Sequence, residues 1–182
     1  MSLLRLVLGS CVEQNVDVVV NAANKFLLPG GGVCGAIFQK AGYASLDEAC
    51  KRIATPLQDG DAVITPSFGI TNAKAIIHAV GPDFRVHPKA FDKLQLAYYH
   101  SLILLKENGY HSIAFPLISA GIFSGELIHP ASESTLQCMN ACRQFDGEFP
   151  EYDIEVLICA YSPEDILDAK RVFPKKDGSL FS

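Results

Sequence analysis

Short runs of mostly apolar, β-branched residues alternate along the chain with longer segments in which apolar residues recur at helical spacing. The apolar runs predict strands at residues 3–8, 17–21, 62–65, 75–80, 112–116 and 154–160. The helical pattern predicts helices at residues 33–41, 46–53, 91–107, 131–145 and 163–172. This alternation is typical of a three-layer α/β/α sandwich with a largely parallel central sheet.

Most of the predicted strands are apolar throughout, which indicates a sheet covered on both faces. In such proteins ligands bind in the crevice outside the carboxyl ends of the strands. Two glycine-containing segments, residues 29–37 and 117–125, each follow a predicted strand. We therefore expect both segments at that edge of the sheet, and we treat them as the candidate site.

The first segment has the character of an anion site. Gly30, Gly31 and Gly32 let a ligand approach the main chain without a Cβ in the way, and a predicted helix begins just after them. The N–H groups of a first helical turn and the positive end of the helix dipole together attract phosphate. A tight turn with no ligand is the alternative, since the segment is neither a dinucleotide-binding fingerprint nor a Walker loop.

The second segment combines glycine with the bulky apolar residues Ile122 and Phe123, and Val33 gives the first segment the same character. Solvent-exposed turns rarely carry such side chains. If the two segments lie on neighbouring strands, their main-chain donors can hold a pyrophosphate from both sides without lysine or arginine. Two unrelated surface turns are the alternative.

Composition narrows the class of protein. The 182 residues include 15 Lys plus Arg and 20 Asp plus Glu, which gives a net charge of −5. Such a chain is not expected to bind nucleic acid by neutralising phosphates, because its basic residues are not massed together. At about 150 residues per domain, the length predicts one domain. No apolar stretch is long enough to span a membrane, and without a signal-like start we expect a cytoplasmic protein.

Single cysteines and histidines carry little chemistry by themselves. The six cysteines, at positions 11, 34, 50, 138, 142 and 159, include no C-x-x-C pair and no histidine at zinc-finger spacing. We expect reduced, mostly buried thiols and no metal site. His78 lies in a predicted apolar strand, where a hydrogen-bonded core histidine is expected, and Asp17 is expected at the start of a strand.

Four segments together resemble the macro domain family: Val-Asn-Ala-Ala-Asn at 20–24, Gly-Gly-Gly-Val-Cys-Gly-Ala-Ile at 30–37, Ile-His-Ala-Val-Gly-Pro at 77–82 and Pro-Leu-Ile-Ser-Ala-Gly-Ile-Phe at 116–123. The resemblance runs from about residue 9 to residue 172, so residues 1–182 are expected to form one such domain with a C-terminal tail at 174–182. It implies a mixed sheet of about six or seven strands and a crevice for ADP-ribose, free or carried on proteins. It implies no cofactor beyond that ligand, and a monomer is expected.

The resemblance also assigns roles to residues. Asn24 would hydrogen-bond the distal ribose and Phe123 would pack against it, which makes these two the catalytic candidates. The ligand-binding set comprises Ser10, Cys11, Ala22, Asn24, Gly30, Gly31, Gly32, Val33, Cys34, Ser119, Ala120, Gly121, Ile122, Phe123 and Tyr161, with Tyr161 stacking on adenine. Two simpler roles remain open: Asn24 as a cap or turn residue, and Tyr161 as an interfacial residue that covers the core.

Two departures from the family pattern affect these assignments. Where the family usually reads Gly-Asp-Ile-Thr and the acid contacts adenine, this chain has Gly9-Ser10-Cys11-Val12, so weaker discrimination of the base is expected. Many cellular hydrolases of the family carry an aspartate and, four residues later, a histidine where this chain has Cys34 and Phe38. Certain viral members also lack that aspartate and still remove ADP-ribose from acidic side chains.

Two functions therefore remain. The first is hydrolysis of a bond at the distal ribose, in a protein ADP-ribosyl ester, O-acetyl-ADP-ribose or ADP-ribose 1''-phosphate, with a water polarised by the substrate's own phosphate. Cys34 as a covalent nucleophile is a less favoured variant of this chemistry. The second is a non-catalytic module that recognises ADP-ribosylated proteins. A dinucleotide-dependent oxidoreductase fits poorly, because no Rossmann fingerprint is present.

Overall fold

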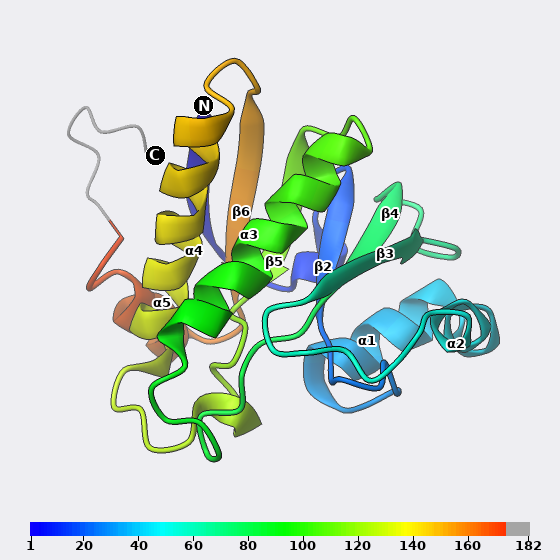
Figure 1. Cartoon of the computed structure of the whole chain (residues 1–182), viewed down its shortest axis with the longest axis horizontal. Coiled ribbons are helices and arrows are strands. Elements are labelled where there is room, and N and C mark those ends of the chain that lie inside the picture. Colours follow the sequence, from blue (N-terminus) through cyan, green and yellow to red (C-terminus); the bar gives the residue numbers. More distant parts are fainter. Residues whose placement is uncertain (174–182) are drawn as a thin grey trace.

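The computed structural model describes residues 1–173, which form a six-stranded sheet between layers of helices (Figure 1). The strand order is β1-β6-β5-β2-β4-β3, and every neighbouring pair is parallel except β3 with β4. The strands are β1 (Ser2–Leu8), β2 (Val18–Ala22), β3 (Ala62–Pro66), β4 (Ala75–Ala79), β5 (Ser112–Pro116) and β6 (Ile154–Ala160). The predicted mixed, largely parallel sheet is confirmed, and the tail at 174–182 lies outside the described residues.

The helices follow the predicted pattern with differences at their ends. They are α1 (Gly32–Ala41), α2 (Tyr43–Lys51), α3 (Phe91–Glu107), α4 (Pro130–Glu148) and α5 (Pro163–Ala169), with short 3-10 helices η1 (Cys11–Glu13) and η2 (Ile122–Ser124). The prediction for 46–53 starts too late, because α2 begins directly after Gly42 with an exposed first turn that lacks the apolar signal. The prediction for 163–172 runs too far, since residues 171 and 172 bond three residues back rather than four.

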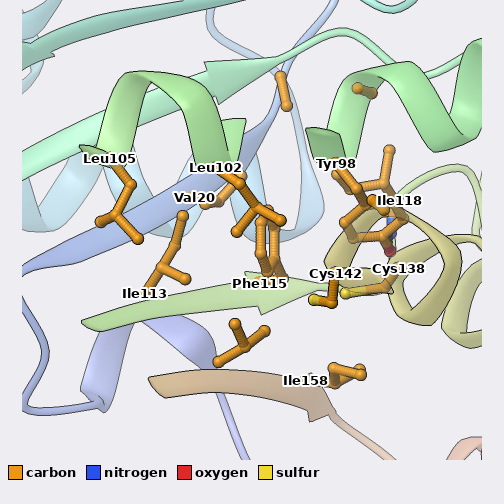
Figure 2. Close-up of a cluster of buried hydrophobic side chains, with 14 of the residues drawn as sticks. Val20, Tyr98, Leu102, Leu105, Ile113, Phe115, Ile118, Cys138, Cys142 and Ile158 are labelled. Carbon is orange, nitrogen blue, oxygen red and sulfur yellow. Dashed lines mark hydrogen bonds between the residues drawn. The ribbon is translucent and has the colours of Figure 1, made fainter. Parts of the chain in front are cut away.

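Two hydrophobic clusters, one on each face of the sheet, make the fold a three-layer sandwich. On one face α3 and α4 lie side by side (Figure 1). Figure 2 shows Leu102 and Leu105 of α3 above Ile113 and Phe115 of β5 in this cluster. On the other face η1, α1 and α2 cover the central strands. Strand β1 lies at an edge of the sheet and exposes alternate residues, so the expectation of complete cover fails there.

The connections after β2 and β5 leave the sheet in opposite directions. Strand β2 leads to α1 on one face, whereas its neighbour β5 leads to α4 on the other face. In open α/β sheets this change of direction between adjacent strands opens a crevice at their carboxyl ends. The fold therefore places both predicted glycine-containing segments at the carboxyl ends of adjacent strands, where such a crevice is expected.

A closed ring of hydrogen bonds fixes the chain where it leaves β5. The Tyr98 hydroxyl, fully buried on α3, donates to Ser134 Oγ at 2.6 Å, and Ser134 Oγ donates to the Ile118 carbonyl at 2.6 Å. The Ile118 N–H closes the ring by donating to the Tyr98 hydroxyl at 3.0 Å. Figure 2 shows Tyr98 beside Ile118 at the edge of the core. The main chain after β5 is thereby held from both helices beneath it.

Replacement of Tyr98 by Phe tests this ring. It leaves the Ile118 N–H and the Ser134 hydroxyl without one of their partners in a buried place, so we expect a loss of about 1–3 kcal/mol in the free energy of unfolding. The matched control is Tyr99→Phe, which removes a hydroxyl that donates to Glu148 at the surface and should change stability by no more than about 0.5 kcal/mol. Chemical denaturation measures both variants. Equal effects would contradict the role of the ring.

Candidate functional site

All the predicted site residues lie at one edge of the sheet, because β1, β6, β5, β2 and β4 are parallel and their carboxyl ends meet there. We call residues 23–31, between β2 and α1, the first loop, and residues 117–129, between β5 and α4, the second loop. The first loop and the first turn of α1 carry Asn24 and the glycines. The second loop carries the residues from Ser119 to Phe123, while Ser10 and Tyr161 follow the adjacent strands β1 and β6.

The side chain of Asn24 closes the first loop. Its Oδ1 accepts the N–H of Phe26 at 3.1 Å and that of Leu28 at 3.0 Å, and its Nδ2 donates to the Leu28 carbonyl at 2.8 Å. The simpler role considered for this residue, a turn cap, is therefore present. Both acceptor positions of the amide oxygen are in use. One N–H remains that no group within residues 1–173 accepts, so Asn24 meets a ligand as a donor.

Cys34 lies under the first loop as a neutral thiol. Its Sγ donates to the Leu28 carbonyl at 3.8 Å, and its side chain is buried. Burial raises the pKa of this thiol, and hydrogen bonds to the sulfur from the Asn21 side chain and the Gly30 N–H offset that rise only in part. The thiolate needed for covalent catalysis is thus disfavoured at neutral pH. The geometry favours a packing role over the nucleophile.

The start of α1 is exposed to the crevice through its main chain. Gly31 precedes the helix, and no side chain among residues 1–173 caps its first turn. The N–H groups of that turn are thus open to an acceptor from outside. Gly35 is required for this arrangement, since a Cβ there would stand 2.7 Å from the Gly30 carbonyl oxygen. The helix start and the glycines consequently form one surface of backbone amides.

The segment after β4 braces the second loop. Ser119 adopts φ +59° and its hydroxyl donates to the Pro82 carbonyl at 2.7 Å, while the Phe84 N–H donates to the Phe123 carbonyl at 2.8 Å. Gly81 approaches so closely that a Cβ would collide with Ser119 Oγ and Ile118 Cγ2. The hydroxyl of Ser119 is therefore committed to the fold, which leaves its main chain to face a ligand.

The bulky apolar side chains of the candidate site differ in exposure. Ile122 is 79% exposed at the tip of the second loop, and Val33 is half-buried on α1. The Phe123 ring lies under the guanidinium of Arg85, 5.4 Å from the ring centroid, and Arg85 is ion-paired with Asp83 at 2.8 Å. The sequence does not reveal the role of Arg85, because nothing local connects it with a ring far along the chain.

Beside these residues lies an open hollow of about 590 Å³. It is lined by Phe84, Arg85, Pro88, Ile122, Gly125, Glu126 and Leu127. Ile122 thus contributes to the hollow as well as to the second loop. The hollow lies between the segment that follows β4 and the second loop.

The opposite end of the crevice brings Ser10 and Tyr161 together. Their hydroxyls lie 3.2 Å apart, and Ser10 Oγ also accepts the Val12 N–H at 3.2 Å as the cap of η1. Tyr161 is 52% exposed, so part of its side chain is accessible to a ligand. Cys11 is fully buried, its thiol donating to the Val20 carbonyl at 3.5 Å, so only its main chain can contribute to a site. Ala22 ends β2 and is half-buried.

The remaining candidates have structural roles. All six cysteines are free, buried thiols. Asp17 stands at the start of β2, where it accepts the His111 N–H at 2.8 Å and pairs with Lys74 at 3.1 Å.

Within residues 1–173 no three His, Cys, Asp or Glu side chains gather as metal ligands would. In the same residues no helix has both the length and the apolar character that crossing a membrane requires.

Comparisons with known proteins agree with this geometry. O-acetyl-ADP-ribose deacetylase of Salmonella typhimurium is 47% identical over 127 residues, covering 67% of this chain and 69% of that protein. The Escherichia coli K12 protein of the same name is 46% identical over 124 residues, covering 66% of this chain and 69% of that protein.

Solved structures extend the likeness over nearly the whole fold. The Oceanobacillus iheyensis macrodomain with ADP has a TM-score of 0.80 at 32% identity, covering 93% of this chain and 88% of that one. The Trypanosoma brucei macrodomain in complex with ADP-ribose has a TM-score of 0.78 at 29% identity, and the likeness covers 92% of this chain and 68% of that one. The Macro domain family model matches residues 20–130, which include both loops. The chain therefore belongs to the macro domain family.

Proposed function

We propose that this chain binds ADP-ribose in the crevice between the two loops and hydrolyses the ester of O-acetyl-ADP-ribose. The observation that carries the proposal is the pair of loops on neighbouring strands β2 and β5, whose connections leave opposite faces of the sheet, together with the main-chain amides at the start of α1, which no side chain of the N-cap residue covers. The names of the curated relatives support the substrate. An acidic chain can hold a diphosphate in this way because the donors belong to the backbone.

The two loops divide the recognition of the ligand. The main chain from Gly31 to Cys34 and that from Ser119 to Ile122 donate to the diphosphate, apart from the Ala120 N–H, which donates to the Leu117 carbonyl at 3.3 Å. Val33 and Ile122 close over the diphosphate. Gly30, Gly32, Ala120 and Gly121 contribute backbone without side-chain bulk. The remaining N–H of Asn24 donates to a hydroxyl of the distal ribose. The ring of Phe123, held by Arg85, packs against the same sugar.

The base binds at the other end of the crevice. The partly exposed ring of Tyr161 stacks on adenine, while the main chain of Cys11 and Ala22 borders the nucleoside. Ser10 offers a hydroxyl already shared with Tyr161 and the Val12 N–H. A hydroxyl both donates and accepts, so it selects the adenine amino group less strictly than a carboxylate would.

The chemistry depends on position rather than on a strong protein base. A water attacks the acetyl carbonyl carbon, the bond to the ribose oxygen breaks, and the ribose hydroxyl leaves with a proton, giving ADP-ribose and acetate. Cys34 stays a neutral thiol and Phe38 is buried, so the substrate's phosphate polarises the water. The same site suits ADP-ribose esters on proteins and ADP-ribose 1''-phosphate, which makes ADP-ribosylated proteins the proposed partners of a monomeric domain.

A reader module is the second candidate. The observation that favours it is the same pair, Cys34 and Phe38, since neither side chain can take up a proton from water at neutral pH. Such a module would bind ADP-ribose through the same loops and release nothing. Turnover therefore separates the two candidates, while binding is common to both.

Replacement of Asn24 by Asp tests the proposed donor. Asp keeps an oxygen for the N–H groups of Phe26 and Leu28 but removes the N–H aimed at the ribose, so we expect kcat/KM for O-acetyl-ADP-ribose to fall by about 100-fold. The matched control is Asn108→Asp at the end of α3, where the amide likewise donates to a carbonyl, that of Leu104, at 2.8 Å. Its rate should stay within about twofold of the wild-type rate, because it lies outside the site.

Acetate release and calorimetric titration with ADP-ribose measure these variants. An unchanged rate for Asn24→Asp would contradict the donor role. Binding of ADP-ribose without acetate release by the wild type would favour the reader, and absence of binding would contradict both candidates.

Replacement of Gly81 by Ala tests the brace of the second loop. The added Cβ displaces Ser119 and Ile118, so we expect a loss of about 1–3 kcal/mol in stability and weaker binding of ADP-ribose by about tenfold. Gly147→Ala in α4 is the control, because a Cβ there meets nothing within 4 Å and favours the helix. Calorimetry and thermal unfolding compare the two, and unaltered affinity in Gly81→Ala would show that the loop does not contact the ligand.

A further inference from the structure

A buried chain of polar side chains crosses the sheet beneath the first loop. Asn21 of β2, His78 of β4 and Thr65 of β3 are each at least nine-tenths buried. Asn21 Nδ2 lies 3.1 Å from His78 Nδ1, and His78 Nε2 lies 2.9 Å from Thr65 Oγ1. His78 is thus the hydrogen-bonded core histidine that the sequence predicts. These contacts also connect the antiparallel edge strand to the strand that carries the first loop.

The donor and the acceptor of each hydrogen bond in this series can be assigned. Because the Asn21 amide nitrogen can only donate, His78 Nδ1 accepts and His78 Nε2 carries the proton. That N–H donates to Thr65 Oγ1, whose own hydroxyl donates to the Pro66 carbonyl at 3.2 Å. Burial lowers the pKa of His78 to about 4, which keeps the ring neutral as this arrangement requires. A single tautomer of His78 therefore fixes the orientation of the Asn21 amide.

From Asn21 the contacts continue into the first loop. The Asn21 side chain also approaches the sulfur of Cys34, where its amide lowers the pKa of the thiol, and Cys34 Sγ donates to the Leu28 carbonyl at 3.8 Å. The same carbonyl accepts from Asn24 Nδ2 at 2.8 Å. Asn24 is consequently tied to the core through Leu28, Cys34 and Asn21.

The Asn21 amide is kept in place at a cost in stability. Its Oδ1 is buried and has no hydrogen-bond partner among the described residues. An unpaired buried acceptor destabilises the folded state, so stability alone does not account for this amide. The amide nitrogen of Asn21, which contacts His78 and Cys34, explains why the amide is present despite this cost.

We propose that His78 and Asn21 are positioning residues, which set the direction of the Asn24 amide through Cys34 and the Leu28 carbonyl. The inference rests on the proposed function, in which the remaining N–H of Asn24 donates to the distal ribose. It makes the rate of ester hydrolysis depend on Thr65, a residue at the far edge of the sheet that touches no ligand. Asn24 itself remains the residue that contacts the substrate.

The test uses three variants around β3. Thr65→Val keeps the shape of the side chain but removes the acceptor of the His78 N–H, whereas Thr65→Ser keeps the hydroxyl. Ser67→Ala is the matched control, since it removes another buried hydroxyl, which donates to the Ala73 carbonyl at 2.9 Å outside the chain of contacts. We expect Thr65→Val and Ser67→Ala to lower the melting temperature similarly. Only Thr65→Val should lower kcat for O-acetyl-ADP-ribose, by about fivefold. Thr65→Ser keeps the hydroxyl and should leave kcat near the wild-type value.

A second readout does not depend on activity. Nitrogen-15 NMR should find His78 protonated at Nε2 alone, and the side-chain NH₂ resonances of Asn24 should shift in Thr65→Val but not in Ser67→Ala. A His78 protonated at Nδ1, equal kcat in Thr65→Val and Ser67→Ala, or unmoved Asn24 resonances would each overturn the inference. If the resonances shift as expected and the wild type binds no ADP-ribose, the proposed function fails while the positioning chain stands.

Discussion

The structure depends on how peptide groups are satisfied where parallel strands end. Beyond the last ladder bond of β2 and of β5 the chain must turn away, and its polar groups need partners that the sheet no longer supplies. Side chains supply some of them: Asn24 and Cys34 hydrogen-bond the main chain of the first loop, and Tyr98 and Ser134 hydrogen-bond that of the second. Because the loops are held from below, their outward amides are left for a ligand.

This arrangement explains how the site tolerates Cys34 where the family pattern has an aspartate. Cys34 replaces an acid of the family pattern, yet its thiol still bonds the Leu28 carbonyl and receives the Asn21 hydrogen bond. A carboxylate in that place would face a carbonyl oxygen that cannot donate to it. The chain therefore keeps the shape of the first loop without a protein base, so catalysis must come from placement of the water and the ester.

Much of the fold could be predicted from the sequence, since the periods of apolar residues located the strands and helices and the glycines marked the crevice. The order of the strands could not, because no local signal makes β5 the neighbour of β2. The sequence also could not show that polar side chains of the candidate site are hydrogen-bonded within the fold. The Asn24 side-chain oxygen accepts hydrogen bonds from its own loop, and the Ser119 hydroxyl donates to the Pro82 carbonyl. Only the three-dimensional structure reveals these contacts. Arg85 reaches Phe123 for the same reason.

The central claim is that backbone amides at the start of α1 and in the second loop hold one diphosphate. Hydrogen–deuterium exchange of the protein with and without ADP-ribose tests it most directly, with AMP as the comparison. The account predicts slower exchange in residues 31–34 and in residues 119–123 together when ADP-ribose is present, and a smaller effect with AMP, which has a single phosphate. Protection of one loop alone, or of neither, would contradict it.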